Sequence, residues 1–198
     1  MLKQSFSGNL IEAGCDEAGR GCLAGPVFAA SVILPHDYKC DLINDSKKLN
    51  EKQRFELRDI IQRDALAWAI ATADNTEIDQ INILNASILS MQRAVEKLQL
   101  IPQLLLIDGN RFKKFKEIPH QCVIKGDAIF MSIAAASILA KTYRDDFMHK
   151  IHLENPNYSW NKNKGYPTLE HKRAIKKFGV TKYHRLTFNM TEQTKLDL

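Results

Sequence analysis

Four acidic residues of this chain could bind divalent metal ions. Each lies at or just after the end of an apolar run, and each has a glycine nearby: Asp16, Glu17, Asp108 and Asp127. In sheets with helices on their faces, ligand sites gather at the strand ends. Carboxylates that converge there repel one another unless cations lie between them. Oxygen donors without a Cys or His cluster select Mg²⁺ or Mn²⁺, and two such ions are suited to phosphodiester hydrolysis.

Some of these carboxylates also have simpler interpretations. Asp108 could belong to an ordinary turn after a strand, and Asp127 could cap a following helix. Asp16 and Glu17 are harder to explain in this way, because they interrupt an apolar segment. Adjacent strand residues point to opposite faces, so this pair reaches one site only if the strand ends or bulges at Glu17.

A glycine–arginine–glycine turn, Gly19-Arg20-Gly21, follows the acidic pair. Glycines let a backbone approach a ligand closely, and a guanidinium group fits a phosphate. The turn therefore predicts a phosphate-binding loop beside the metal site. Asp145 is about 27 Å along the same expected helix from Asp127, so we interpret it as a partner of Lys141 or Arg144, or as solvated.

The elements that must position these residues follow from apolar periodicity. The pattern predicts five strands, at residues 10–16, 26–34, 65–73, 103–109 and 121–127. It predicts helices at residues 51–63, 77–99, 128–153 and 168–178, with a loop at 155–167. Asn50 and Thr168 are the expected N-caps of the first and last helices. The second helix carries one apolar stripe: Ile81, Leu84, Ile88, Met91, Val95 and Leu98.

The 198 residues, 44% of them hydrophobic, fit one catalytic domain over residues 1–198. Residues from about 155 to 198 are expected to form a helical and loop extension that binds substrate. The net charge is +5, and residues 141–187 hold eleven Lys and Arg against four Asp and Glu. This excess is compatible with nucleic-acid binding and equally with a solvated helical surface.

The cysteines indicate neither a zinc site nor a disulfide framework. None of them forms a CxxC pair: Cys15, Cys22, Cys40 and Cys122. They are typical of reduced, buried thiols in a cytosolic protein. No segment resembles a signal peptide or a membrane span. We therefore expect a cytoplasmic location and no membrane association.

Several blocks of the sequence together resemble the type 2 ribonuclease H family, ribonuclease HII. In order, they are Asp16-Glu17-Ala18-Gly19-Arg20-Gly21, Leu23-Ala24-Gly25-Pro26-Val27, Asp45-Ser46-Lys47-Lys48-Leu49, Leu106-Ile107-Asp108-Gly109-Asn110, Lys125-Gly126-Asp127, Ser132 to Lys141, Arg144-Asp145, Lys164-Gly165-Tyr166, His171 and His184-Arg185. They span residues 10–188. Two positions depart from the pattern: Cys22 stands where the family commonly has proline, and Pro167 where it often has glycine.

The resemblance implies an α/β, RNase H-like fold, with a mixed five-stranded sheet flanked by helices and a helical C-terminal portion. It implies an endoribonuclease that hydrolyses the RNA strand of RNA–DNA hybrids. The same enzyme would cut 5′ of ribonucleotides embedded in duplex DNA, using two Mg²⁺ or Mn²⁺ ions. Its products would carry 5′-phosphate and 3′-hydroxyl ends.

The family motif also implies roles for particular residues. The catalytic metal ligands would be Asp16, Glu17, Asp108 and Asp127. Gly19, Arg20 and Gly21 would contact the ribose 2′-hydroxyl and adjoining phosphates, which fits the use of that hydroxyl to distinguish RNA from DNA. Tyr166 would pack against the sugar or base at the RNA-to-DNA step. Candidate phosphate contacts, each equally readable as solubilising charge, are Lys47, Lys48, Lys141, Lys164 and Arg185.

The expected partners are RNA–DNA hybrids and ribonucleotide-containing duplex DNA, bound by a monomer. A replication clamp is a conceivable partner through the C-terminal tail, although no motif there requires one. Two other functions stay open. A non-cleaving module of the same fold could bind duplexes, but the intact acidic set argues against it. A DNA-directed nuclease or recombinase would cut an all-DNA duplex equally well.

Overall fold

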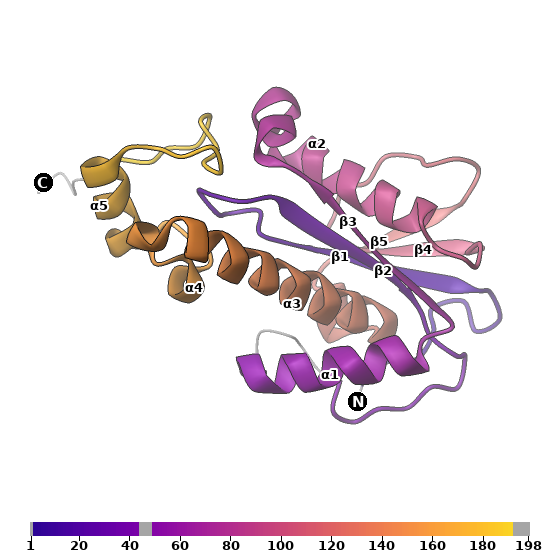
Figure 1. Ribbon diagram of the computed structural model, residues 1–198. Helices are drawn as coiled ribbons and strands as arrows, with labels where there is room; N and C mark the ends of the chain where they lie inside the picture. The colour runs from indigo at the N-terminus through magenta and orange to yellow at the C-terminus, as the bar shows by residue number, and fades with distance from the viewer. Residues whose placement is uncertain (1, 44–48, 192–198) are drawn as a thin grey trace, which may run out of the picture.

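The computed structural model describes residues 2–43 and 49–191, and its centre is a mixed five-stranded sheet (Figure 1). The strands are β1 Glu12–Ala18, β2 Val27–Ile33, β3 Ala67–Ala73, β4 Leu104–Asp108 and β5 His120–Val123. Their order across the sheet is β3-β2-β1-β4-β5. The pairs β1–β2 and β2–β3 are antiparallel, whereas β1–β4 and β4–β5 are parallel. The predicted α/β class and mixed sheet are confirmed.

Helices cover both faces of the sheet. They are α1 Glu51–Asp64, α2 Asn75–Glu96, α3 Met131–Glu154, α4 Trp160–Asn163 and α5 Leu169–Phe178, with short 3₁₀ turns η1 Gly126–Ala128 and η2 Pro156–Tyr158. In Figure 1, α2 lies over one face, and α1 and α3 lie over the other. The second half of α3 runs past the sheet to α4 and α5, which form the helical C-terminal portion. No helix of the described chain has the length and apolar character to span a bilayer.

The N-caps expected for α1 and α5 are present, whereas α2 departs from its expected pattern. Asn50 and Gln53 form a reciprocal capping box at α1, and the Thr168 hydroxyl accepts the His171 N–H at α5, 3.2 Å. The long apolar stripe expected of α2 is interrupted, because Asn82 adopts a left-handed φ of 65°. Its side chain accepts the backbone N–H of Asn85 at 3.1 Å and so starts a second helical segment. Ile81, before the break, is 37% exposed.

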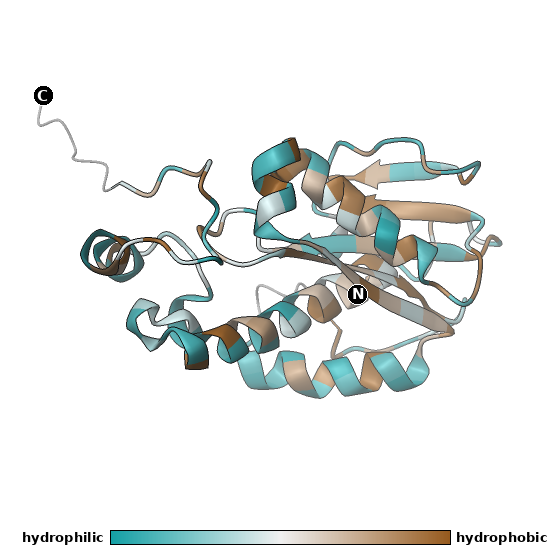
Figure 2. Ribbon diagram, turned by 45° about the horizontal axis from the view of Figure 1, so that its top comes forward, coloured by the Kyte–Doolittle hydropathy of each residue, from teal (hydrophilic) through white to brown (hydrophobic). Residues whose placement is uncertain are grey.

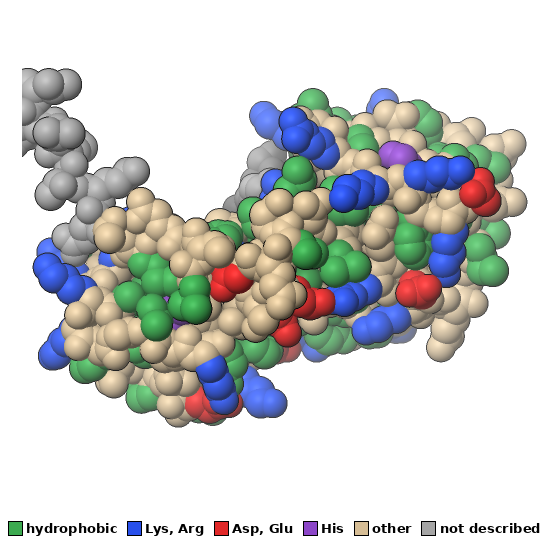
Figure 3. Space-filling view, turned by 90° about the horizontal axis from the view of Figure 1, so that it is seen from above, with side chains coloured by type: hydrophobic (Ala, Val, Ile, Leu, Met, Phe, Trp, Pro, Cys, Tyr) green, Lys and Arg blue, Asp and Glu red, His purple; other side chains and the backbone are tan. Residues whose placement is uncertain are grey.

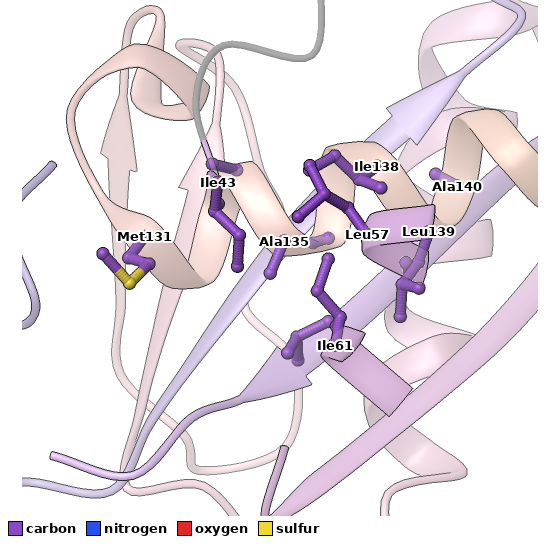
Figure 4. Packing of buried hydrophobic residues seen from close by; sticks show 12 residues of the cluster. Ile43, Leu57, Ile61, Met131, Ala135, Ile138, Leu139 and Ala140 are labelled. Atoms are coloured by element: carbon purple, nitrogen blue, oxygen red, sulfur yellow. The ribbon is translucent and has the colours of Figure 1, made fainter. Parts of the chain in front are cut away.

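Apolar packing holds the two helical layers against the sheet. Figure 4 shows the cluster under α3, where Leu57 and Ile61 of α1 meet Ala135, Ile138 and Leu139 of α3. In Figure 2, hydrophobic colour predominates in some strands of the sheet, whereas other strands and much of the helices are hydrophilic. The small residues in the first half of α3 allow this helix to approach the sheet very closely.

Gly14 marks the closest approach of β1 to α3. A Cβ atom at this position would overlap the backbone of Ser132 and Ile133. Because both partners are backbone, no side-chain rotation can make room. Gly14 therefore fixes the distance between the strand that carries Asp16 and the helix that covers it.

A hydrogen-bonded histidine pair organises the C-terminal portion. His184 Nδ1 accepts the Thr181 N–H at 2.9 Å, so its Nε2 carries the proton and faces His171 Nε2 at 3.3 Å. His171 Nε2 also accepts the Trp160 Nε1–H at 3.0 Å. Consequently His171 Nδ1 carries a proton and donates it to the Tyr166 carbonyl at 3.0 Å. The network requires both imidazoles to be neutral, and it holds the backbone of Tyr166.

Replacing Gly14 by alanine should lower the free energy of unfolding by about 1–3 kcal/mol, because β1 must move away from α3. Urea denaturation of the purified variant measures this change. Gly21→Ala is the matched control, since a Cβ at Gly21 meets no atom within 4 Å. A loss no larger in Gly14→Ala than in the control would show that the helix is not held at this distance.

Acid should destabilise the native state through His184. Burial, followed by the electrostatic effect of the neighbouring His171, lowers the pKa of His184 from 6.5 to about 4. Between these values the unfolded chain binds a proton that the native chain does not, so stability is lost as the pH falls. This group should contribute a loss of ~2 kcal/mol between pH 7 and pH 5. Urea titrations at both pH values should show a shallower dependence in His184→Gln; an equal dependence would contradict the assignment.

Candidate active site

Parallel pairing of β1 and β4 brings two carboxylates to one end of the sheet. The last paired residues are Cys15 and Ile107, so Asp16 and Asp108 follow at neighbouring positions. Together with Glu17 they line a pocket of ≈ 380 Å³. The backbone N–H of Gly126, after β5, donates to Asp108 Oδ1 at 2.7 Å. Asp108 ends β4 as expected, whereas Asp16 lies within β1, at the point where its pairing with β4 has stopped.

The position of Glu17 differs from the sequence-based expectation. β1 neither ends nor bulges there, because it stays paired with β2 through Ala18. Asp16 lines the pocket beside Ser137 of α3, whereas Glu17 also lines a second pocket against α2. The pairing with β4 stops at Cys15, which leaves that side of β1 open. Glu17 can therefore border both pockets although the strand alternates regularly.

Burial and mutual repulsion raise the proton affinity of this acidic group. The pKa of Asp16 lies well above its ordinary value, first because of burial and then because Glu17 and Asp108 are close. The Ser137 side chain and the Glu17 N–H, 2.6 Å from Asp16 Oδ1, partly oppose this shift. Burial also raises the pKa of Glu17, against the opposing charge of Arg20 at 3.1 Å. A nearby cation would stabilise the ionised forms.

The donor set fits a hard divalent cation. Glu17 Oε2 is buried and has no hydrogen-bond partner among the described residues, so it has an oxygen free for an ion. The three carboxylates of the pocket supply only oxygen ligands, which Mg²⁺ and Mn²⁺ prefer. In the described part of the chain, no three Asp, Glu, His or Cys side chains already stand in an arrangement that would hold a metal ion. Binding would therefore require the carboxylates to adjust.

Asp127 does not line the pocket that the other three carboxylates share. β5 ends at Val123, earlier than the expected strand, and Asp127 falls in the 3₁₀ turn η1. Its side chain is buried, yet it is not among the residues that line either pocket. The alternative role as cap of the long helix is wrong, because α3 begins at Met131 with Phe130 at the N-cap. The neighbouring Gly126 places the backbone of this turn beside Asp108.

Two buried arginines fix the loop that follows β1. Arg144 donates to the carbonyls of Ala24, Pro26 and Lys164 at 2.8–3.2 Å. Arg185 donates to the carbonyls of Gly25 and Arg20 at 2.8–3.0 Å. Burial lowers the pKa of Arg185 to about 10, so its side chain stays charged at neutral pH. The loop backbone is thus held by guanidinium groups from two distant parts of the chain.

Gly19 is required where this loop begins. Its φ of 98° is unfavourable for other residues, and a Cβ atom would overlap the Arg144 side chain. Gly21 faces open space, and the Arg20 side chain is 52% exposed. All three residues line the pocket that contains the carboxylates. The predicted proximity of the loop to the acidic group is therefore present in the structure.

Tyr166 lies across the same pocket and is 40% exposed. Its N–H donates to the Asn163 carbonyl at 2.9 Å, and its own carbonyl accepts the proton of His171 Nδ1. Burial, and then the neighbouring Cys22 thiol, raises the pKa of the Tyr166 hydroxyl. Cys22, one of the two departures from the family pattern, thus stands directly beside this ring.

The other basic residues have varied positions. Lys47 and Lys48 lie outside the described residues, so their proposed phosphate contacts stay predictions. Arg185 is fully buried against carbonyls, and Lys164 pairs with Glu51 at 3.1 Å, so neither is presented to a phosphate. Lys141 lines the pocket and pairs with Asp145 at 2.6 Å. Figure 3 shows one face of the molecule, where acidic side chains near the middle lie close to Lys and Arg.

Sequence reasoning missed two residues of the pocket, Arg54 and Ser137. Arg54 extends from α1 and lies 4.0 Å from Asp145, and Ser137 bonds Asp16. Neither stands beside a glycine or a strand end. Only the tertiary packing of α1 and α3 brings them to the site, so no local signal could have found them.

Comparisons with known proteins agree with this geometry. The family model described as Ribonuclease HII matches residues 13–191. Two curated relatives named Ribonuclease HII are very similar. The protein from Bacteroides thetaiotaomicron is 61% identical over 100% of this chain and 99% of its own length. That from Phocaeicola vulgatus is 62% identical over 96% of this chain and 94% of its own length.

Solved structures support the fold independently. The ribonuclease H2 of Pyrococcus horikoshii superimposes with a TM-score of 0.74 and 23% identity, covering 90% of this chain and 94% of its own. A complex of PCNA with RNase HII from Archaeoglobus fulgidus contains a match with a TM-score of 0.75 and 21% identity, covering 95% and 100%. With the matched family model and the close relatives, these findings identify the chain: it belongs to the ribonuclease HII family and is a ribonuclease H endonuclease.

Proposed function

We propose that the protein hydrolyses the RNA strand of RNA–DNA hybrids and cuts 5′ of ribonucleotides embedded in duplex DNA. The products carry 5′-phosphate and 3′-hydroxyl ends. One observation carries the proposal: carboxylates of β1 and β4 share a pocket with the Gly19–Gly21 loop and Tyr166. An acidic pocket would repel a phosphodiester unless cations were bound, whereas the loop and the ring suit a nucleotide. The expected state is a monomer.

Asp16, Glu17, Asp108 and Asp127 are the proposed ligands of two divalent ions. When bound, the ions supply an activated water and stabilise the leaving oxygen. Support comes from the unpartnered oxygen of Glu17 and the all-oxygen donor set. A ribonuclease HIII solved in complex with Mn²⁺ has the same fold, with a TM-score of 0.71 and 17% identity over 91% of this chain and 67% of its own.

The chain's own residues orient the strand to be cut. The backbone of the Gly19–Gly21 loop, which lines the pocket, approaches the ribose closely enough to contact its 2′-hydroxyl, and Arg20 reaches the adjoining phosphate. The Tyr166 ring packs on the sugar that follows. The loop is fixed by Arg144 and Arg185, so these contacts require little reorganisation on binding.

Matched 5′-labelled duplexes test the function. One contains a single ribonucleotide, one is all DNA, and one is a continuous RNA–DNA hybrid. With Mg²⁺ or Mn²⁺ the first should be cut once, 5′ of the ribonucleotide, and the hybrid at several positions, whereas EDTA should abolish both reactions. Metal-dependent cutting of the all-DNA duplex would favour a DNA-directed nuclease. Tight binding without cleavage of any duplex would favour the non-cleaving module.

Asp16→Asn should abolish cleavage without loss of stability. Removing a metal ligand should cost roughly 100-fold or more in rate. The raised pKa of Asp16 means that its charge opposes folding when no metal is bound, so the variant should be at least as stable as the wild type in EDTA. Asp146→Asn is the matched control, since this half-exposed carboxylate pairs with Arg58 outside the pocket. Retained turnover in Asp16→Asn would refute the ligand assignment.

A further inference from the structure

A second pocket, of ≈ 290 Å³, lies on the α2 side of the same sheet end. It shares Glu17, Arg20 and Asp108 with the first pocket. The remaining lining residues come from α2 and from the segment after β4: Leu84, Ser87, Ile88, Met91, Gly109, Asn110 and Arg111. The two pockets therefore meet at the carboxylates, and the proposed function uses only the first.

An unsatisfied hydroxyl lines this second pocket. Ser87 is 1% exposed, and its Oγ has no hydrogen-bond partner among the described residues. One turn later, Ser90 satisfies its hydroxyl by donating to the Ser87 carbonyl at 2.8 Å. A buried hydroxyl without a partner costs free energy, and a ligand with a polar group in the pocket would remove that cost. The position of Ser87 thus points to a bound molecule.

The segment after β4 supplies a cation to the pocket. Arg111 is exposed and forms no ion pair with a side chain of residues 2–43 or 49–191. Two of the three lysines that follow it are already paired, Lys114 with Glu117 and Lys116 with Glu96, both at 3.0 Å. A guanidinium group presents a planar fork of donors that fits a phosphate.

Apolar side chains contribute to the lining of the pocket. Ile88 and Met91 are buried, and Leu84 is half-buried. These apolar side chains, one hydroxyl and one guanidinium match the parts of a nucleotide, which has a flat base or sugar face, polar edges and a phosphate. A free anion alone would not use the apolar side chains, and Glu17 and Asp108 would repel it.

We propose that this pocket is a nucleotide subsite that binds the residue on the 5′ side of the scissile phosphate. The inference rests on the proposed function, which assigns the ribonucleotide on the 3′ side to the first pocket. A strand that crosses the carboxylates from Tyr166 enters the second pocket on the opposite side. Arg111 contacts the phosphate one step 5′ of the cut, and Ser87 hydrogen-bonds the same nucleotide.

A double-mutant-type cycle, in which a phosphate charge of the duplex and the charge of Arg111 are removed separately and together, tests the subsite. One duplex with a single ribonucleotide keeps all phosphates, and a second carries a neutral methylphosphonate one step 5′ of the cut. The wild type should lose roughly tenfold in kcat/KM on the modified duplex. Arg111→Ala should show a similar loss on the unmodified duplex and little further loss on the modified one. Compared with Arg111→Ala, Arg111→Lys should recover part of the activity on the unmodified duplex and part of the sensitivity to the methylphosphonate.

Two controls make the cycle specific. Lys113→Ala removes an exposed charge from the same segment but not from the pocket lining, so it should keep the full sensitivity to the methylphosphonate. A methylphosphonate one step 3′ of the cut should add its loss to that of Arg111→Ala. If the losses from Arg111→Ala and from the 5′ methylphosphonate were additive, the subsite would be overturned while the proposed function stayed intact.

Binding provides a readout that does not require cleavage. Anisotropy titrations of the same duplexes with Mg²⁺, in the non-cleaving Asp16→Asn background, should show the same non-additivity between Arg111→Ala and the 5′ methylphosphonate. Ser87→Ala should weaken binding about threefold without lowering the urea midpoint, because it removes an unsatisfied hydroxyl. Unchanged binding by Ser87→Ala, or additive losses for Arg111, would refute the subsite even if no duplex were cut.

Discussion

Asp16 and Asp108 stand side by side because β1 and β4 run parallel, and their negative charges oppose each other in a buried pocket. This repulsion is the constraint around which the surrounding structure is arranged. Gly14 lets α3 press on β1 and exclude water from Asp16. The N–H groups of Glu17 and Gly126 partly compensate the charge. The remaining imbalance is what a bound cation would relieve.

The sequence predicted the parts of the site that depend on one strand or one turn. Asp16 and Asp108 follow apolar runs, and such runs end at the edge of a sheet where ligands bind. The caps at Asn50 and Thr168 were readable because capping needs a particular side chain at one position. The resemblance to the family implied roles for further residues to which no local pattern assigns one.

Features that depend on tertiary contacts were not predictable. The sequence suggested that Asp16 and Glu17 reach one site only if β1 ends or bulges at Glu17, and this was wrong. β1 continues regularly, and both residues reach the pocket because β4 stops pairing with β1 at Cys15. Arg185 resembled a surface cation in the sequence, but it lies in the interior against carbonyls 160 and 165 residues away. The break at Asn82 needs a left-handed backbone that apolar periodicity cannot signal.

The contacts of Arg185 also determine when the site is complete. Residues 20 and 25 leave the ribosome early in synthesis, but the guanidinium that binds their carbonyls emerges with almost the last part of the described chain. Until then the carboxylates can already be folded on β1 and β4 while the adjoining loop lacks one of its two anchors. Nascent chains, or chains truncated before Arg185, would therefore carry the acidic pocket beside a loop that is incompletely anchored.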